Sequence, residues 1–559
     1  MSNATDAIRS ARDLLLGLRG QGDEARAQFS WPEITGPFNW AIDWFDAVGR
    51  GRDDVALWLR DEHSQDERYT YGEMVERSDR LAAWLEANGV GKGDVVMLML
   101  ANQVELWDAM LAVMKVGGII LPTAQALQHH DLADRVQRAS VTAVIANATD
   151  EDKFDGIDDI TRITTGPARG DWLAMAESVA LPAEPRAVVT DADDPVLYYF
   201  TSGTTKDPKL VVHTQVSYPV GHLSTMYFLG VRPGDVHLNI SSPGWGKHAW
   251  SSFFSPWLAE ATVFSYNYAR FDAAAMLKEL EDSAVTTFCA PPTVWRMMIQ
   301  AHLGDKPSSL REAVGAGEPL NPEVISSVER AWGLTIRDGY GQTETTCTIG
   351  NAPGEAVRPG SMGKVMPGVR LDVVDPDTGE VSQHGEITFP LDPWPFNLTP
   401  GYLGGVPATA GEDGRYHSGD LVSASDDGYL TYVGRTDDVF KASDYKISPF
   451  ELESVLIEHP AVVEAAIVPA PDPIRHAVPK AYVKLAAGHE PTRETALSIL
   501  LHARDNLAPY LRVRRIEFAD LPKTISGKVR RVVLRAREHD PAAEIDDFRY
   551  EDFPELKRR

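Results

Sequence analysis

Segments with a helical apolar period alternate with short β-rich runs through residues 73–290. Helical patterns at 73–87, 105–115 and 131–139 are followed by apolar runs at 95–100, 119–122 and 142–145, and a second series combines runs at 236–240, 261–264 and 285–290 with a helical pattern at 272–283. Such alternation is typical of βαβ units, whose strands run parallel. The sequence therefore predicts an α/β fold with parallel sheets.

Two later regions have a different pattern. Residues 363–389 contain short strands separated by turn residues, which predicts a small β subdomain. Beyond residue 436 we expect helices at 449–458 and 494–506 and strands at 462–468 and 515–518. We therefore predict a large N-terminal body over 1–436 and an α+β C-terminal domain over 437–559, joined near Asp437.

The charge balance narrows the class of partner. The chain has 559 residues, with 54 Lys plus Arg against 81 Asp plus Glu, and a formal net charge of −27. A nucleic-acid binder needs a basic face to displace the counterions of the phosphate backbone, and the basic residues here are scattered among more numerous acids. The sequence therefore favours a soluble protein that acts on small molecules, with no nucleic-acid partner.

The N-terminal segment, the apolar runs and the cysteines indicate the compartment in which the protein acts. Residues 1–20 resemble an amphipathic helix, because Arg9, Arg12 and Arg19 interrupt the leucines, and they lack the apolar core of a secretory signal. Apolar runs elsewhere are much shorter than the roughly 18 residues that a membrane span needs, so we predict none. Cys289 and Cys347 are the only cysteines. Two thiols suit a reducing compartment, and we expect a cytoplasmic protein.

An apolar strand leads into a loop with the composition of a phosphate site. The loop offers hydroxyls, glycine and lysine at Thr201, Ser202, Gly203, Thr204, Thr205, Lys206 and Lys209. Glycine lets the backbone approach phosphate oxygens, hydroxyls donate hydrogen bonds, and Lys209 supplies positive charge. This spacing differs from that of the P-loop. For the segment alone, a polar turn after a strand is an equally good interpretation.

Further motifs follow in a fixed order. They are Gly317-Glu318-Pro319, Asp338-Gly339-Tyr340-Gly341-Gln342-Thr343-Glu344, Tyr416-His417-Ser418-Gly419-Asp420-Leu421, Gly434-Arg435-Thr436-Asp437-Asp438 and Pro522-Lys523-Thr524-Ile525-Ser526-Gly527-Lys528. Together with the loop at 201–209, this series resembles the adenylate-forming (AMP-binding) superfamily. It is similar to the acyl-CoA synthetase branch, near the acetyl- and medium-chain enzymes. The resemblance implies a body that binds ATP and an acid, and a mobile C-terminal domain.

The resemblance implies a nucleotide site built from these motifs. Gly317, Glu318 and Pro319 would border adenine, Tyr340 would stack on it, and Asp338 would accept from its amine. Thr343 would contact the α-phosphate, and Glu344 would bind Mg²⁺, which takes few protein carboxylates when it is bound to ATP. Asp420 would bind the ribose hydroxyls, and Arg435 would contact ribose or phosphate. Taken one at a time, each residue could instead be a packing or surface group.

The C-terminal motifs imply catalysis and movement. Lys528 would sit between the acid carboxylate and the α-phosphate, and the domain would swing about the Asp437 hinge between two half-reactions. Ser443 and Asp444 fall in a segment that lines the thiol tunnel in the family, and Arg504 is a candidate for a CoA phosphate. Two departures stand out, because the family generally has glycine where this chain has Lys206 and Asp444. A carboxylate at Asp444 would narrow a pantetheine channel.

Residues 241–250 resemble the acyl-binding segment of the family, and at subgroup level that of 2-hydroxyisobutyryl-CoA ligases. Trp245 would cap a short pocket, while Lys247 and His248 would offer polar contacts that an alkyl chain does not need. We expect a short, branched, hydroxylated or aromatic acid.

The expected enzyme is an AMP-forming acid–thiol ligase. It would use ATP and Mg²⁺ to convert a small carboxylic acid into an acyl-adenylate and then into a CoA thioester, as a possible homo-oligomer. A stand-alone adenylation enzyme that loads a carrier-protein thiol is the alternative, which the Asp444 departure keeps open. A non-catalytic nucleotide sensor is disfavoured because Lys528 and Glu344 are both present.

Overall fold

The computed structural model describes residues 3–63, 65–201, 209–404, 406–407, 411, 413–442, 445–472, 476–524, 528–540 and 542–557. For residues 406, 407, 445, 446, 476 and 557 it describes the backbone alone. The predictions for Ser202, Gly203, Thr204, Thr205, Lys206, Ser443 and Asp444 lie outside the described residues.

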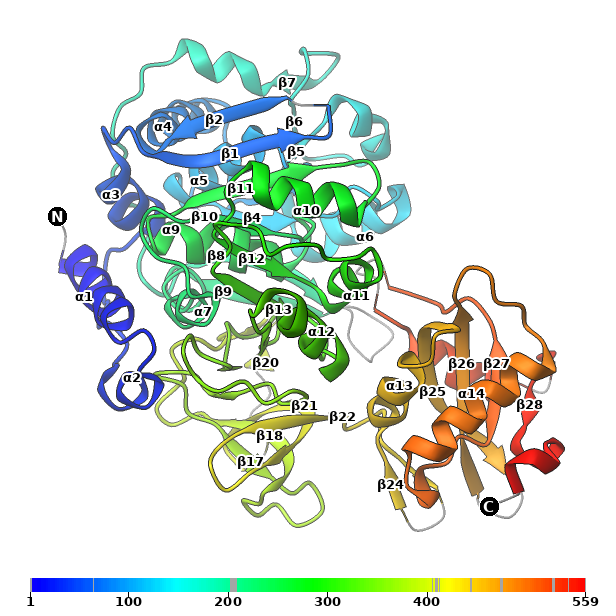
Figure 1. Cartoon of the computed structure of the whole chain (residues 1–559). Helices are drawn as coiled ribbons and strands as arrows, with labels where there is room; N and C mark the ends of the chain where they lie inside the picture. The colour runs from blue at the N-terminus through cyan, green and yellow to red at the C-terminus, as the bar shows by residue number, and fades with distance from the viewer. Residues whose placement is uncertain are drawn as a thin grey trace.

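Within the described residues, two nine-stranded sheets form the centre of the body (Figure 1). The first contains, in spatial order, β16 (Lys364–Val365), β15 (Ile349–Gly350), β14 (Arg337–Tyr340), β13 (Glu312–Ala316), β12 (Thr287–Ala290), β10 (Val236–Asn239), β11 (Thr262–Asn267), β1 (Val55–Asp61) and β2 (Asp66–Thr70). From β14 to β1 every neighbouring pair is parallel. The carboxyl ends of these strands therefore meet at one edge, where α/β sheets bind ligands.

The second sheet is also largely parallel. It contains β20 (Val406–Pro407), β19 (Gly401–Tyr402), β9 (Lys209–Thr214), β8 (Pro195–Thr201), β4 (Ile119–Pro122), β3 (Val95–Met99), β5 (Val141–Ala146), β6 (Thr161–Thr164) and β7 (Trp172–Ala174). Its strands from β8 to β7 are parallel, and β9 is antiparallel to β8. The predicted α/β fold with parallel sheets is confirmed.

Helices cover the faces of these sheets. They are α1 (Asn3–Gly17), α2 (Gly22–Gln28), η1 (Trp40–Asp46), α3 (Ala47–Gly49), α4 (Tyr71–Ala87), α5 (Val104–Lys115), α6 (His129–Ala139), η2 (Ala148–Phe154), η3 (Met175–Ala180), α7 (Leu223–Leu229), α8 (Gly246–Ala249), η4 (Trp250–Phe254), α9 (Ser255–Leu258), α10 (Ala273–Asp282), α11 (Pro292–Gln300) and α12 (Pro322–Trp332). Local sequence sets their ends: Thr70 and Glu73 form a reciprocal capping box at the start of α4. None of the described helices combines the length and the apolar character that a membrane span requires.

A four-stranded antiparallel sheet packs at the lower end of the body (Figure 1). In the described chain its strands are β17 (Asp372–Val374), β18 (His384–Pro390), β21 (Arg415–Ala424) and β22 (Leu430–Arg435). Its buried face is formed by alternate residues such as Ile387, Phe389 and Val422. The predicted small β subdomain is present, and its last strands carry Asp420 and Arg435.

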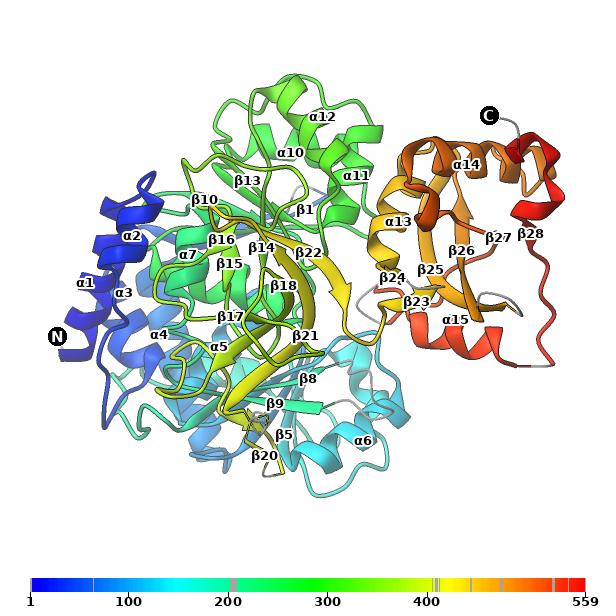
Figure 2. The ribbon, with the colours of Figure 1, turned by 90° about the horizontal axis from the view of Figure 1, so that it is seen from below.

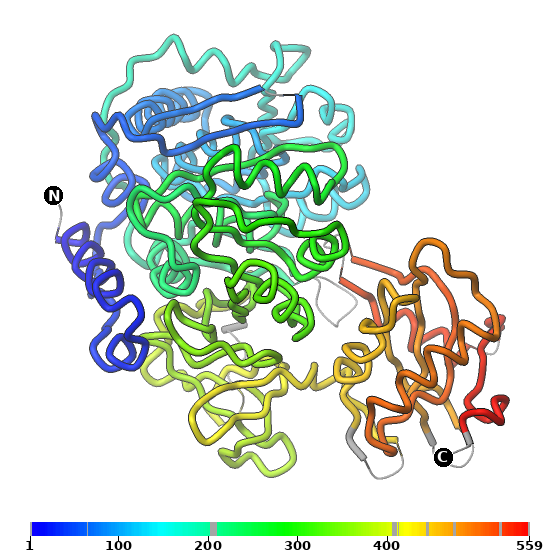
Figure 3. Tube along the Cα trace, viewed as in Figure 1, coloured from blue at the N-terminus to red at the C-terminus, as the bar shows by residue number. Residues whose placement is uncertain are grey.

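The residues after β22 fold into a separate α+β unit on the side of the body opposite α1 and α2 (Figures 1 and 2). The unit contains β23 (Phe440–Ala442), β24 (Tyr445–Ile447), α13 (Pro449–Ile457), β25 (Val462–Asp472), β26 (His476–Leu485), α14 (Arg493–Asn506), η5 (Pro509–Leu511), β27 (Arg515–Phe518), α15 (Arg531–Glu538), β28 (Phe548–Arg549), η6 (Tyr550–Asp552) and η7 (Pro554–Lys557). The tube in Figure 3 follows the chain across from β22.

The C-terminal tail belongs to the core of this unit. Strand β28 pairs with β27, and Tyr550, Phe553 and Leu556 are buried against residues of α13 and α14. From the sequence, the aromatic residues of this acidic tail are compatible either with docking against a protein surface or with disorder. Because Tyr550, Phe553 and Leu556 are all buried, the tail docks against the chain's own C-terminal domain.

Candidate active site

Asp420, on β21, is the centre of a hydrogen-bond network that joins three of the predicted motifs. Its Oδ2 accepts from the Tyr340 hydroxyl at 2.6 Å and from Gln342 Nε2 at 2.5 Å. Its Oδ1 accepts from Arg435 Nη1 at 3.3 Å and from the Tyr432 hydroxyl at 3.4 Å. The predicted ribose ligand is thus held in place by donors from β14, β22 and the loop that follows β14.

Glu344 lies in the loop after β14 and has one tyrosine partner. The Tyr402 hydroxyl donates to Glu344 Oε1 at 2.9 Å, and Lys209 Nζ lies 4.9 Å from the centre of the same tyrosine ring. Burial raises the pKa of Glu344 above its usual range. A bound cation would offset that burial, so this carboxylate fits the Mg²⁺ site that the sequence predicts.

The neighbouring Thr343 is fixed through its backbone. Its carbonyl oxygen lies 2.7 Å from Nε2 of His213, a buried imidazole on β9. Burial lowers the pKa of His213 to about 4, so this ring is neutral and donates from Nε2. The loop that carries Thr343 and Glu344 is therefore attached to the second sheet.

Asp338 is buried within β14, next to its first residue Arg337. Its two oxygens accept from the backbone N–H groups of Gly339 at 2.9 Å and Leu320 at 3.3 Å. Burial raises its pKa to about 7. The Leu320 contact also fixes the adjacent segment Gly317-Glu318-Pro319, in which Gly317 has a φ of +108° that favours glycine.

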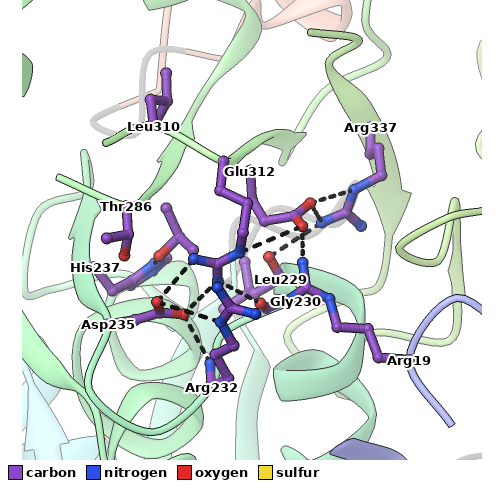
Figure 4. Close-up of polar contacts among 12 residues, drawn as sticks. Arg19, Leu229, Gly230, Arg232, Asp235, His237, Thr286, Leu310, Glu312 and Arg337 are labelled. Carbon is purple, nitrogen blue, oxygen red and sulfur yellow. Dashed lines mark hydrogen bonds and ion pairs between the residues drawn. The ribbon is translucent and has the colours of Figure 1, made fainter. Parts of the chain in front are cut away.

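Arg337, the neighbour of Asp338 in the sequence, belongs to a cluster of arginines and acids (Figure 4). Arg337 is buried, donates to Glu312 Oε2 at 2.7 Å from Nη2, and also reaches the carbonyl oxygens of Leu229 and Asn351. Glu312 in turn accepts from Arg19 of the N-terminal segment, and Arg311 pairs with Asp235. The start of β14 is thus anchored on the side away from the nucleotide motifs.

The predicted acyl segment forms α8 and leads into η4. His248 Nε2 lies 3.0 Å from Asn102 Oδ1, and burial lowers the pKa of this imidazole to about 3. Lys247 is different, because its Nζ is buried with no hydrogen-bond partner among the described residues. Trp245 is half-buried. The structure thus engages His248 in packing and leaves Lys247 available.

The predicted hinge lies between two sets of ion pairs. Arg435 Nε lies 3.5 Å from Asp437, on the body side. Asp438 instead pairs with Arg535 and, at 3.6 Å, with Arg531, both on α15 of the C-terminal domain. Consecutive residues are therefore tied to different parts of the molecule.

The two remaining candidates lie on the C-terminal domain. Lys528 is exposed, and its backbone N–H donates to Thr524 Oγ1 at 3.2 Å. The described residues between β27 and α15, 519–524 and 528–530, lie on the side of the C-terminal domain that faces the body (Figure 1). Arg504 pairs with the adjacent Asp505 at 2.7 Å on α14. In the described chain, the structure joins neither side chain to the Asp420 network.

Some residues of the network were not singled out from the sequence. Gln342 and Tyr416 lie inside the quoted motifs, and Tyr416 donates to Gln342 Oε1 at 3.0 Å, so the motifs themselves contained a signal. Tyr402 and Tyr432 lie outside them. Tyr402 is 58 positions from its partner Glu344, and no local pattern indicates such a pair.

Two family models match the chain. The model of the AMP-binding enzyme family matches residues 44–403, more than half of the chain, and that of the AMP-binding enzyme C-terminal domain matches residues 451–528. The chain belongs to the AMP-binding enzyme family. Within the family, it is 42% identical over 516 residues to 4-hydroxybutyrate–CoA ligase 1 of Metallosphaera sedula, which covers 90% of this chain and 91% of the relative.

Other AMP-binding enzymes agree in sequence and fold. Mitochondrial acyl-coenzyme A synthetase ACSM3 of Rattus norvegicus is 36% identical over 534 residues, covering 90% of this chain and 91% of the relative. A Brucella canis acyl-CoA synthetase structure has a TM-score of 0.70 at 30% identity, covering 92% and 98% of the two chains. The anthranilate CoA ligase AuaEII, solved with anthranoyl-AMP, has a TM-score of 0.80 at 25% identity, covering 90% and 98%.

This AMP-binding enzyme is an acyl-CoA ligase that uses ATP, Mg²⁺ and CoA. It converts a carboxylic acid into an acyl-adenylate and then into a CoA thioester. The relatives are CoA ligases, so the carrier-protein alternative is not favoured.

Proposed function

We propose that this ligase activates a short carboxylic acid that carries a hydroxyl group. The observation that carries the proposal is the half-buried Trp245 near Lys247, whose Nζ is buried with no hydrogen-bond partner in the described part of the chain. A purely hydrocarbon tail would leave the Lys247 ammonium without a hydrogen-bond acceptor, which is costly for a buried charge. The relative named for 4-hydroxybutyrate supports the same substrate class.

We assign the nucleotide roles as follows. Asp338 accepts a hydrogen bond from the adenine amine. Tyr340 stacks on the adenine ring, which is bordered by Gly317, Glu318 and Pro319. Asp420 and Arg435 bind the ribose. Thr343 contacts the α-phosphate, Glu344 holds Mg²⁺, and the loop from Thr201 to Thr205 with Lys209 binds the remaining phosphates. Mg²⁺ bound there would neutralise phosphate charge. The Asp420 network supports this assignment, because it holds the proposed ribose ligand in a fixed rotamer.

Two half-reactions follow from this arrangement. A carboxylate oxygen of the acid forms a bond to the α-phosphorus as the bond to pyrophosphate breaks, with Lys528 between the two charged groups. The CoA sulfur then attacks the acyl carbon, its thiol proton is lost, and AMP leaves. We infer that the domain after residue 436 swings about Asp437 between the two steps. In the second step, Ser443, Asp444 and Arg504 approach CoA. We further infer that the enzyme acts in the cytoplasm.

A panel of acids tests the proposal. Purified enzyme with ATP, Mg²⁺ and each of a set of acids of two to eight carbons, with and without hydroxyl groups, is assayed for pyrophosphate and then for CoA thioester. We expect short hydroxy acids to give the highest kcat/KM. A clear preference for unsubstituted or longer acids would contradict the proposed substrate class, and pyrophosphate release without thioester in the presence of CoA would contradict the second half-reaction.

A further inference from the structure

Lys247 lies at the carboxyl edge of the first sheet. Its Nζ is buried, and its charge interacts with Cys289 at the end of β12, Glu318 after β13 and Asp338 on β14. Burial lowers the pKa of Lys247 below its usual range. A buried ammonium that lacks an acceptor is expected to meet one in a ligand, because an unsatisfied buried charge destabilises the fold.

Trp250 lies three residues further on, where α8 continues into η4. Residues three apart on a helix lie on the same face, so Lys247 and Trp250 both face β14 and the loop after it. A Cβ atom built on Gly341 would overlap the Trp250 ring and the carbonyl oxygen of Thr346. The indole therefore occupies the space that the absent side chain of Gly341 leaves, and it packs α8 against the loop after β14.

The other polar side chain of α8 is already engaged. His248 Nε2 is satisfied by Asn102, and its ring packs 5.6 Å from Trp107, centre to centre. Because burial keeps the His248 imidazole neutral, this side chain needs no counterion. Lys247 is therefore the residue of this helix that can recognise a polar group of the acid through a hydrogen bond.

We propose that Lys247 donates a hydrogen bond to a hydroxyl oxygen at the end of the acid remote from its carboxylate, and that Trp250 ends the pocket there. This inference rests on the proposed function. It assigns the hydroxyl to the far end of a short unbranched acid, and it places Trp250 rather than Trp245 at the end of the pocket. A hydroxyl fits better than a second carboxylate, because Glu318 and Asp338 already supply negative charge around this ammonium.

The first test concerns the hydroxyl. Values of kcat/KM for pyrophosphate release are measured with 4-hydroxybutyrate, butyrate and succinate in the wild type, Lys247→Met, Lys247→Gln and His248→Leu. We expect the wild type to prefer 4-hydroxybutyrate over butyrate by more than about tenfold, Lys247→Met to lose most of that ratio and Lys247→Gln, which keeps a donor, to retain part of it. His248→Leu serves as the control for packing damage and should keep the wild-type ratio.

The second test concerns length. The ratio of kcat/KM for hexanoate over butyrate should rise about tenfold in Trp250→Leu, because two further methylene groups then find buried space. Ratios within one variant cancel any change in ATP binding or in the amount of folded enzyme.

The outcomes separate the inference from the function on which it rests. An unchanged hydroxy ratio in Lys247→Met, an equal loss in His248→Leu, or a preference for succinate would overturn the role of Lys247 while adenylation of short acids stands. An unchanged hexanoate ratio in Trp250→Leu would overturn the role of Trp250. If the wild type activates none of these acids but activates others, the proposed substrate class fails, and this assignment fails with it.

Discussion

At the scale of single residues, Asp338 and Lys247 are two buried charged groups on facing elements. Burial raises the pKa of Asp338 to about 7, and Lys247 opposes that rise. Asp338 is therefore protonated below about pH 7 and ionised above it, within the range in which most enzymes are assayed.

The titration of Asp338 predicts how ATP binding depends on pH. An ionised carboxylate accepts a hydrogen bond from an amino group more strongly than a protonated acid does. We expect KM for ATP in the wild type to rise about fivefold as the pH falls from 8 to 6, beyond the change seen in Asp338→Asn. The asparagine variant controls for the titration of ATP itself. Parallel pH profiles in the two enzymes would show that Asp338 does not bind the base.

Lys528 predicts a division of labour between the half-reactions. Lys528→Ala should slow pyrophosphate release by about a hundredfold or more, because the charge that develops between carboxylate and phosphate loses its ammonium. Thioester formation from supplied acyl-adenylate and CoA should stay near the wild-type rate. Lys523→Ala is the matched control, since Lys523 lies in the same loop and pairs with Glu464 at 2.7 Å. Equal losses in both half-reactions of Lys528→Ala would contradict the assignment.

At the scale of elements, β13 and β14 both begin with a charged residue, and one acid holds them together. Glu312 contacts Arg337 and Arg19, while Arg311 lies 3.9 Å away (Figure 4). Burial and the neighbouring arginines lower the pKa of Arg19 to about 10, so Arg19 joins a site that is already rich in cations.

Because one acid, Glu312, lies among several arginines, we expect its loss to lower the free energy of unfolding more than the loss of one arginine does. Glu312→Gln removes the acid from between several arginines and should lower the free energy of unfolding by about 3–5 kcal/mol. Arg19→Met removes one of those arginines and should cost less than about 1 kcal/mol. Urea unfolding followed by tryptophan fluorescence measures both. A larger loss for Arg19→Met would mean that the N-terminal helices, rather than Glu312, hold the cluster together.

The elements themselves were largely predictable, because apolar period and turn residues are local signals. The helix expected at 73–87 is α4, which starts two residues earlier because Thr70 rather than a residue of the apolar pattern caps it. The strand expected at 462–468 continues to Asp472 as β25. Pairing with β26, not the apolar run, sets that length.

The candidate site was predictable only in part. Asp338, Tyr340, Glu344, Asp420 and Arg435 lie in motifs, and the structure links Tyr340, Asp420 and Arg435 directly. The partner of His248 could not be predicted, because Asn102 is 146 positions away and follows a strand of the other sheet. Trp250 lies in the predicted acyl segment, but its role could not be predicted, since only the fold brings its ring against Gly341.

At the scale of the whole molecule, two consecutive side chains between the body and the C-terminal domain form ion pairs with different parts of the chain. The Asp437 carboxylate pairs with Arg435 of the body, whereas the Asp438 carboxylate pairs with Arg531 and Arg535 of α15. A rotation of the domain would therefore concentrate in the backbone of Asp437.

Restricting that backbone should separate the two half-reactions. Asp437→Pro fixes φ near −65°, so we expect it to slow thioester formation by at least about tenfold and to spare adenylation. Stopped-flow measurement of pyrophosphate release and CoA consumption follows each step. Asp437→Ala removes the ion pair without restricting φ and should retain both rates. If Asp437→Pro also retains both, the pivot lies elsewhere.

The tail gives the synthesis of this protein a definite order. Lys480 is fully buried and pairs with Glu517 on β27, Glu538 on α15 and, at 3.5 Å, Asp547 beside β28. Asp547 and the buried Tyr550, Phe553 and Leu556 are synthesised after the other residues of this core. The body can close its sheets while translation continues. The domain that carries Lys528 completes its core only after Leu556 has left the ribosome, so an arrest of translation just before Asp547 would leave an enzyme with a finished nucleotide site and an unfinished catalytic domain.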